Sequence, residues 1–284
     1  MRLVLGSVQF GMNYGILKNK KINFRELKKI KNLSIKSKIR FIDTASSYGK
    51  SEALIAKSKL SSLNVITKIK LPKIKNLNIK NWIDKEINKS LTKLKISKVY
   101  AILIHDYKDL LGVRGKKYLY FLQKLKKKKI IKKIGISIYS HVEIKKIWKF
   151  WKPDIVQVPF NVIDNRILRS RWLEILKRSK IKIFARSIFL QGLLINKHDN
   201  LKFNKKNKMV LNKFKHWCFK SKISPVKACL HFVKQFKKID YLIVGFNNYQ
   251  HLKQIVDYYN EHQHKIPRIF STNDLNLIDP RRWS

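Results

Sequence analysis

Glycine is scarce in this chain of 284 residues, which contains only 9 glycines. No G-x-G-x-x-G pattern occurs, and this absence argues against a Rossmann-type dinucleotide-binding domain. Gly6 and Gly11 have the spacing of a phosphate-binding P-loop, but Met12 and Asn13 stand where that loop needs a lysine and a hydroxyl residue. The sequence therefore lacks the usual motif of nucleotide hydrolysis.

Cysteine and long apolar runs are also scarce. Cys218 and Cys229 are too few for a disulfide framework, and we expect free, partly buried thiols in a reducing compartment. No apolar run approaches the roughly 20 residues of a membrane span. The first residues enter a strand-like run without the pattern of a signal peptide. We therefore expect a cytoplasmic protein with no membrane partner.

Acidic residues are few, since 17 Asp and Glu stand against 65 Lys and Arg. Such an excess is typical of proteins that bind nucleic acid or anionic membranes. It is equally typical of AT-rich genomes, whose proteins are also rich in Ile and Asn. The lysines are spread along the whole chain and no nucleic-acid-binding module is recognisable, so we expect no specific nucleic-acid partner. A basic polyanion-binding protein is the alternative.

A metal-binding motif is missing as well. A metal-dependent barrel hydrolase would need a His-x-His pattern at the end of the first strand, and none occurs there. The pair His262 and His264 follows the last predicted barrel helix, where a surface tail is expected. We predict no metal site.

Short apolar runs alternate with amphipathic segments along the chain. Eight runs read as strands: 3–8, 39–43, 63–68, 99–105, 131–137, 154–158, 181–185 and 241–245. Helical spacing separates them over 24–36, 51–60, 79–94, 118–128, 142–150, 167–178, 207–236 and 249–258, with the seventh split near Ser224 and Pro225. Eight βα units with right-handed crossovers predict a single-domain (β/α)₈ TIM barrel over residues 1–284, with a tail from about 265.

Four polar residues follow three neighbouring predicted strands. Asp43 ends the second strand, Tyr48 lies in the loop after it, Lys68 ends the third strand and His105 ends the fourth. The carboxyl ends of barrel strands converge on one pocket, so the four side chains should meet there. Each residue alone is a weak signal, but the set in this order is informative.

The set can act as an acid–base device. A free tyrosine has a pKa near 10, and a cation close by lowers it. Lys68 would supply that cation, Asp43 would hold Lys68 in place, and His105 would orient a substrate carbonyl. Tyr48 would then donate a proton to the carbonyl oxygen while hydride reaches the carbon. Protein side chains supply no hydride, so a reduced nicotinamide is required.

The chain resembles the aldo-keto reductases over nearly its whole length. The resemblance rests on the four residues above, on the segment from Phe41 to Glu52, and on these further segments: 134–137, 156–161, 185–192 and 243–245. It implies an NAD(P)H-dependent oxidoreductase that interconverts an aldehyde or ketone and its alcohol, with Tyr48, Asp43, Lys68 and His105 as catalytic residues.

The resemblance also implies a cofactor site. Ser137 and Gln157 would hold the nicotinamide carboxamide, and Ser187 and Phe189 would line the pyrophosphate path. Gly245, Asn247 and Gln254 would lie near the adenosine end. The family expectation is NADPH, with NADH possible.

Three departures from the family pattern affect this cofactor site. Ile138 stands where an asparagine is usual, and Arg186 stands where an aromatic ring often stacks on the nicotinamide. No Arg or Lys lies between Gly245 and His251, where many members grip the 2′-phosphate.

The closing segment 277–283 looks like that of members found with surface-polysaccharide genes. This likeness suggests a sugar-like carbonyl as the small-molecule substrate. We expect a monomer or weak homo-oligomer. The alternative is a catalytically silent barrel that serves as a binding or regulatory subunit.

Overall fold

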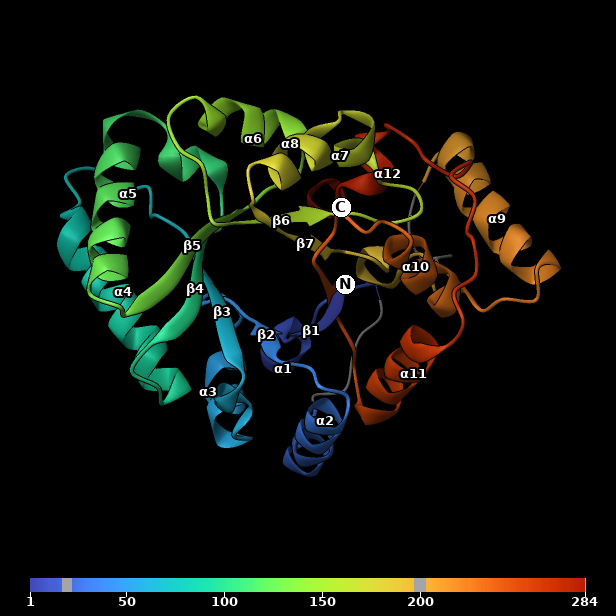
Figure 1. The fold of residues 1–284 in the computed structure, drawn as a ribbon, viewed down its shortest axis with the longest axis horizontal. Coiled ribbons are helices and arrows are strands. Elements are labelled where there is room, and N and C mark those ends of the chain that lie inside the picture. The colour runs from blue at the N-terminus through green and yellow to red at the C-terminus, as the bar shows by residue number, and fades with distance from the viewer. Residues whose placement is uncertain (17–21, 197–202, 284) are drawn as a thin grey trace.

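Eight parallel strands close into a barrel in a computed structural model that describes residues 1–16, 22–196 and 203–283 (Figure 1). The strands are β1 (Arg2–Gly6), β2 (Phe41–Asp43), β3 (Asn64–Ile69), β4 (Val99–Ile104), β5 (Ile131–Ser137), β6 (Ile155–Pro159), β7 (Lys182–Arg186) and β8 (Tyr241–Val244). Each pairs with its neighbours in sequence, and β1 closes on β8 with Leu3 opposite Leu242. The predicted (β/α)₈ fold is confirmed.

Successive strand residues face opposite sides of the barrel wall. Val4, Phe41, Phe184 and Ile243 fill the inside, where the Phe184 ring stacks on Tyr241 at 4.3 Å. Their strand neighbours, such as Leu3 and Leu5, belong to the larger core between the strands and the helices. Both faces are buried, which explains why the strands appear in the sequence as nearly unbroken apolar runs.

Helices surround the barrel. They are α1 (Val8–Gly11), α2 (Phe24–Lys36), α3 (Ser51–Lys57), α4 (Ile79–Leu94), α5 (Gly112–Lys127), α6 (His141–Trp148), α7 (Arg166–Arg169), α8 (Trp172–Arg178), α9 (Lys205–Lys220), α10 (Pro225–Lys234), α11 (Tyr249–Asn260) and α12 (Leu275–Ile278). Side chains of Asn23, Asn78, Asn204, Ser224 and Asn248 cap the first turns of α2, α4, α9, α10 and α11. A cap of this kind satisfies one of the amide groups that a helix start leaves unpaired.

Some predicted boundaries were wrong. The segment 167–178 is not one helix, because Arg171 adopts a left-handed conformation that separates α7 from α8. Helix α5 starts at Gly112, six positions before the predicted residue 118, since residues 112–117 contain two glycines and a single, exposed apolar side chain, Val113, and so show no apolar periodicity. The segment after β1 is not all loop, because α1 forms a single turn there.

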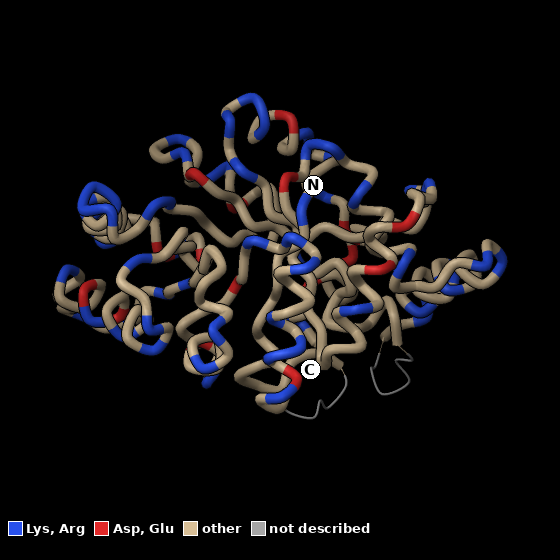
Figure 2. Tube along the Cα trace, turned by 60° about the horizontal axis from the view of Figure 1, so that its bottom comes forward, with Lys and Arg blue, Asp and Glu red and all other residues tan. Residues whose placement is uncertain are grey.

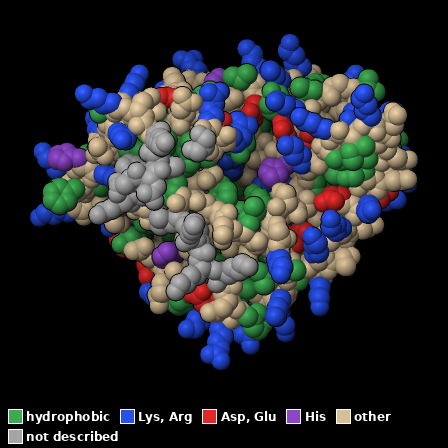
Figure 3. Space-filling model, turned by 180° about the vertical axis from the view of Figure 1, so that it is seen from behind, with side chains coloured by type: hydrophobic (Ala, Val, Ile, Leu, Met, Phe, Trp, Pro, Cys, Tyr) green, Lys and Arg blue, Asp and Glu red, His purple; other side chains and the backbone are tan. Residues whose placement is uncertain are grey.

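The C-terminal tail packs on the barrel instead of leaving it. Leu277 and Ile278 of α12 are buried, and α12 lies near the chain end in Figure 1. Lys and Arg occur along all parts of the described chain (Figure 2), and they stand mainly around the rim of the face seen in Figure 3, with few acids between them. None of the helices in the described segments is long and apolar enough to span a bilayer.

Candidate active site

A buried ion pair lies at the carboxyl ends of β2 and β3. Lys68 Nζ is 2.6 Å from Asp43 Oδ2, and the two side chains are only 2% and 7% exposed. Lys68 also donates to the carbonyl of Thr44, and Gln157 Nε2 donates to the other Asp43 oxygen at 2.8 Å. Asp43 is therefore held from both sides, and it fixes the ammonium of Lys68 in turn.

Tyr48 and His105 lie directly over this pair. Lys68 Nζ is 5.1 Å from the centroid of the Tyr48 ring, and the Tyr48 and His105 rings meet edge to face at 6.3 Å. His105 follows β4, where its amide donates to the carbonyl of Ile69 on β3. The structure thus brings together the four residues that the sequence singled out.

The loop that carries Tyr48 is locked against the first strand. A side chain on Gly11 would place its Cβ 1.8 Å from the Tyr48 carbonyl, and Gly49 adopts a positive φ of 54° facing Gly11. Beneath this contact, Ser51 shares hydrogen bonds with Ser7 at 2.8 Å and with Thr44 at 3.1 Å. Gly11 and Gly49 therefore allow the two backbone segments to pack in direct contact, and this contact sets the position of the Tyr48 phenol.

Burial dominates the acid–base state of these groups. It lowers the pKa of His105 to about 3, helped by the charges of Lys68 and Arg186, so this imidazole is neutral. Burial and the Asp43 carboxylate raise the pKa of Tyr48 above its usual value, and burial lowers the pKa of Lys68. The expected lowering of the Tyr48 pKa is not seen, because burial is the largest influence on this phenol and raises its pKa. Tyr48 is a phenol, ready to donate a proton.

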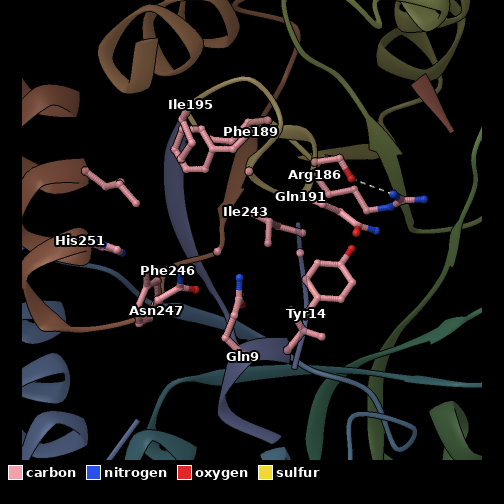
Figure 4. A pocket seen from close by; sticks show the side chains of 18 of the residues that line it. Gln9, Tyr14, Arg186, Phe189, Gln191, Ile195, Ile243, Phe246, Asn247 and His251 are labelled. Carbon is pink, nitrogen blue, oxygen red and sulfur yellow. Dashed lines mark hydrogen bonds between the residues drawn. The ribbon is translucent and has the colours of Figure 1, made fainter. Parts of the chain in front are cut away.

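A cavity of about 370 Å³ opens beside Tyr48 and runs over β1, β7 and β8 (Figure 4). Arg186, Gln191 and Tyr14 lie toward one end of this view, and His251 and Asn247 toward the other. Its lining includes these residues from the predicted sets: Asp43, Tyr48, Gln157, Ser187, Phe189, Gly245, Asn247 and Gln254. Lys68, His105 and Ser137 are not among the lining residues, and Lys68 and Ser137 are buried.

The loop after β7 has an unusual backbone. Ser187, Leu190 and Gln191 have positive φ angles of 57°, 46° and 54°, and Gly192 follows with 94°. Left-handed non-glycine residues are strained and collect at functional sites, and left-handed turns form concave rows of amides that bind anions. The amides of Leu190 and Gly192 donate to the carbonyls of Ser187 and Phe189, so these turns hold in the cavity wall the two residues that the resemblance assigns to the pyrophosphate path.

Two buried amide oxygens face the cavity without a partner. Gln157 Oε1 and Gln9 Oε1 make no hydrogen bond within the described residues, and both side chains line the cavity. A buried acceptor left unpaired is costly, so such atoms mark places where a ligand donor is expected. The carboxamide N–H groups of a nicotinamide are donors of this kind, and the residues present fit the cofactor.

Sequence reasoning missed Gln9 and Tyr14, while Arg186, which it placed where an aromatic ring often stacks on the nicotinamide, lines the cavity. Tyr14 lines the cavity, and burial raises its pKa to about 12. Arg186 donates to Ser187 Oγ and to the carbonyl of Ile138, and its guanidinium lies 4.2 Å from the Tyr139 ring. Gln9 and Tyr14 lie after the first strand. The rule that polar residues after barrel strands point toward the active site, which identified the other four residues, would have found them too.

Other polar clusters do not compete with this site. Within residues 1–16, 22–196 and 203–283, no group of three His, Cys, Asp or Glu side chains is placed to hold a metal ion. His264 instead stacks on His231 at 5.5 Å, and its amide donates to His231 Nδ1. Cys218 and Cys229 are free and buried, as predicted, and burial raises the pKa of both thiols.

A closed (β/α)₈ barrel with this quartet and cavity defines a class of nicotinamide-dependent barrel oxidoreductases. The family model of the aldo/keto reductases matches residues 2–269, so the chain belongs to the aldo/keto reductase family. It is therefore an NAD(P)-dependent oxidoreductase that acts between carbonyls and alcohols. A search of curated proteins found no match.

Solved structures of bacterial proteins share the fold. An aldo-keto reductase from Bacillus halodurans in its holo form has a TM-score of 0.73 at 15% identity, over 93% of this chain and 88% of that one. A glycerol dehydrogenase from Gluconobacter oxydans has a TM-score of 0.70 at 18% identity, with the same coverage. A putative aldo-keto reductase from Pseudomonas aeruginosa has a TM-score of 0.66 at 18% identity, over 90% and 88%. At such identities these structures support the fold alone.

Proposed function

We propose that this chain reduces an aldehyde or ketone, with Tyr48 as the general acid and general base. The Asp43–Lys68 pair beside the Tyr48 ring is the observation that carries the proposal. Burying two charges costs desolvation energy, and charged groups buried beside a cavity cluster at functional sites. Neutral His105 would donate a hydrogen bond to the substrate carbonyl. Tyr48 would pass its proton to the oxygen as the carbon is reduced.

The nicotinamide would supply the hydride and would lie along the cavity of Figure 4. Gln157, with the buried Ser137 beside it on β5, would hold the carboxamide of the nicotinamide. The loop after β7, with Ser187 and Phe189, would lie along the pyrophosphate of the cofactor. Gly245, Asn247 and Gln254 would surround the adenosine. We propose NADPH as the preferred form, with the His251 side chain lining that end of the cavity.

Further parts of the proposal concern the setting of the enzyme. A sugar or sugar-like carbonyl is the proposed substrate, and the cytoplasm is the proposed location. We propose a monomer or weak homo-oligomer without a specific nucleic-acid partner. Lys and Arg are spread over the whole described chain, and this spread supports amino-acid composition as the origin of the positive charge, instead of a localised binding surface.

A carbonyl screen tests the proposal. Purified protein is expected to consume NADPH or NADH when given aldehydes or keto sugars, and to form one alcohol for each nicotinamide oxidised. The measurement is the loss of reduced-nicotinamide absorbance, with product alcohol determined by chromatography. Absence of turnover with both nicotinamides across aldehydes, ketones and keto sugars would refute the reductase assignment.

The pH profile follows from the protonation states. Tyr48 has a raised pKa and His105 a pKa of about 3, so neither group changes charge near neutrality. Reduction needs the phenol, and its kcat is expected to stay level from about pH 6 to about pH 9. Alcohol oxidation needs the phenolate and should rise steadily with pH over the same range. A fall in reduction kcat centred near neutral pH would show that Lys68 lowers the Tyr48 pKa after all.

A further inference from the structure

A second cavity of about 340 Å³ lies at the carboxyl end of the barrel and, among the described residues, shares no lining residue with the first. Its walls come from the loop after β5, the start of α6, the start of α7 and the C-terminal tail around α12. The lining residues are Tyr139, Ser140, Glu143, Arg166, Leu275, Asp279, Arg281 and Arg282. Three arginines in so small a space call for an explanation.

Buried carboxylates orient two of these arginines. Arg166 donates from Nε at 2.8 Å and from Nη2 at 2.9 Å to Asp164, whose side chain is 1% exposed. Arg281 donates in the same manner to Asp279, with Nη2 at 2.6 Å from Oδ2. The Nη1 group of each guanidinium makes no hydrogen bond within the described residues. A guanidinium fixed on one edge presents its remaining N–H groups to an anion at little entropic cost.

The Tyr139 ring contacts an arginine from each cavity. The guanidinium carbon of Arg186 lies 4.2 Å from the centroid of the Tyr139 ring, and that of Arg281 lies 3.6 Å from it. Arg186 lines the first cavity next to Tyr48, while Arg281 lines the second. Tyr139, with the two guanidinium groups that contact its ring, therefore lies between the Arg186 side of the first cavity and the Arg281 side of the second.

One guanidinium of the second cavity, that of Arg282, is left without a carboxylate in the described part of the chain. Asp164 and Asp279 are each taken up by one arginine, and Glu143 accepts the amide of Tyr139 at 2.6 Å. Arg282 and Arg186 have no carboxylate partner within the described residues, since they donate to Asn276, Ser187 and Ile138. Around the second cavity three guanidinium groups thus meet three carboxylates, and Arg282 is the guanidinium without a carboxylate partner within the described residues.

We infer that the second cavity binds an anionic group of the substrate, a phosphate or a carboxylate, through Arg281, Arg282 and Arg166. The inference rests on the proposed function, because it assigns this group to the molecule whose carbonyl is reduced. It makes the preferred substrate an acidic aldehyde or ketone, such as a sugar phosphate or a keto acid.

Matched substrate pairs test the inference at constant ionic strength. The pairs are glyceraldehyde 3-phosphate with glyceraldehyde, and 4-carboxybenzaldehyde with its methyl ester. The wild type is expected to favour the anionic member of at least one pair by about tenfold or more in kcat/KM, which corresponds to about 1.4 kcal/mol. The pair that shows the preference tells phosphate from carboxylate. Equal kcat/KM within both pairs would overturn the inference and leave the reductase function standing.

Charge variants locate the effect. Arg281→Gln and Arg282→Gln are expected to bring the anionic-to-neutral ratio toward one, with Arg281→Lys in between because it keeps the charge but loses the planar fork. Arg282 is the safer change, since its side chain bonds only to Asn276 at 3.4 Å. Arg25→Gln removes the same charge from an exposed site on α2 and should leave the ratio as in wild type. A ratio unaltered in both glutamine variants at the cavity would refute the assignment.

A binding measurement separates this inference from the proposed function. Inorganic phosphate and benzoate are titrated into wild type, Arg281→Gln and Arg25→Gln, and thermal unfolding is followed. At least one anion should raise Tm more in wild type and Arg25→Gln than in Arg281→Gln. This result in a protein that reduces no aldehyde would sustain the anion site while the reductase function fails. Equal Tm shifts in all three proteins would overturn the site.

Discussion

Replacing Tyr48 by phenylalanine is expected to lower the kcat of carbonyl reduction by about 10²–10⁴-fold, the usual contribution of a positioned general acid. The change removes one oxygen and keeps the ring that meets His105 edge to face and lies above Lys68. Affinity for the nicotinamide should therefore remain close to wild type. Steady-state kinetics with a reducible aldehyde and a fluorescence titration of NADPH measure the two quantities.

Tyr14→Phe is the matched control for this experiment. Tyr14 is a second buried phenol in the same cavity, also with a raised pKa of about 12, and the Tyr48 proposal gives it no chemical role. Its loss should change kcat far less than the loss of Tyr48. If instead Tyr14→Phe abolishes turnover while Tyr48→Phe works normally, the acid has been assigned to the wrong residue.

The barrel could be predicted from the sequence because its strands are buried on both faces. Runs such as Val99–Ile104 appear as unbroken apolar segments, and their alternation with helical periodicity leaves few other topologies. Helix α4 matched its predicted bounds of 79–94, because Asn78 caps it and its apolar spacing lasts to the final turn. The break at Arg171 was not predictable, because this residue adopts a left-handed conformation although it is not a glycine.

The set of Asp43, Tyr48, Lys68 and His105 was predictable for the same topological reason. Asp43 and Lys68 each end a strand, so the fold alone brings them to one edge of the barrel. The protonation states could not be foreseen, because they depend chiefly on how deeply Tyr48, His105 and Lys68 are buried. The packing of the tail was not predicted, since the four residues of helix α12 around Leu277 are too few to show a helical period.

Lys68→Met is expected to abolish activity and to lower the free energy of unfolding by about 3–5 kcal/mol, the usual cost of removing one partner of a buried ion pair. The Asp43 carboxylate would remain beneath the surface with Gln157 as its chief remaining side-chain donor. Methionine has nearly the shape of the lysine stem, so the loss would arise from charge and not from a cavity. Urea unfolding followed by circular dichroism measures the stability, and aldehyde turnover measures the activity.

The double variant Asp43→Asn with Lys68→Met separates the structural role of this pair from its chemical role. An asparagine at position 43 still accepts the Gln157 hydrogen bond and carries no charge, so most of the lost stability should return. Activity should stay at the level of the single variant, because the ammonium beside the Tyr48 ring is still missing. Turnover that recovers together with stability would mean that the pair only supports the fold, and that proton donation by Tyr48 needs no neighbouring cation.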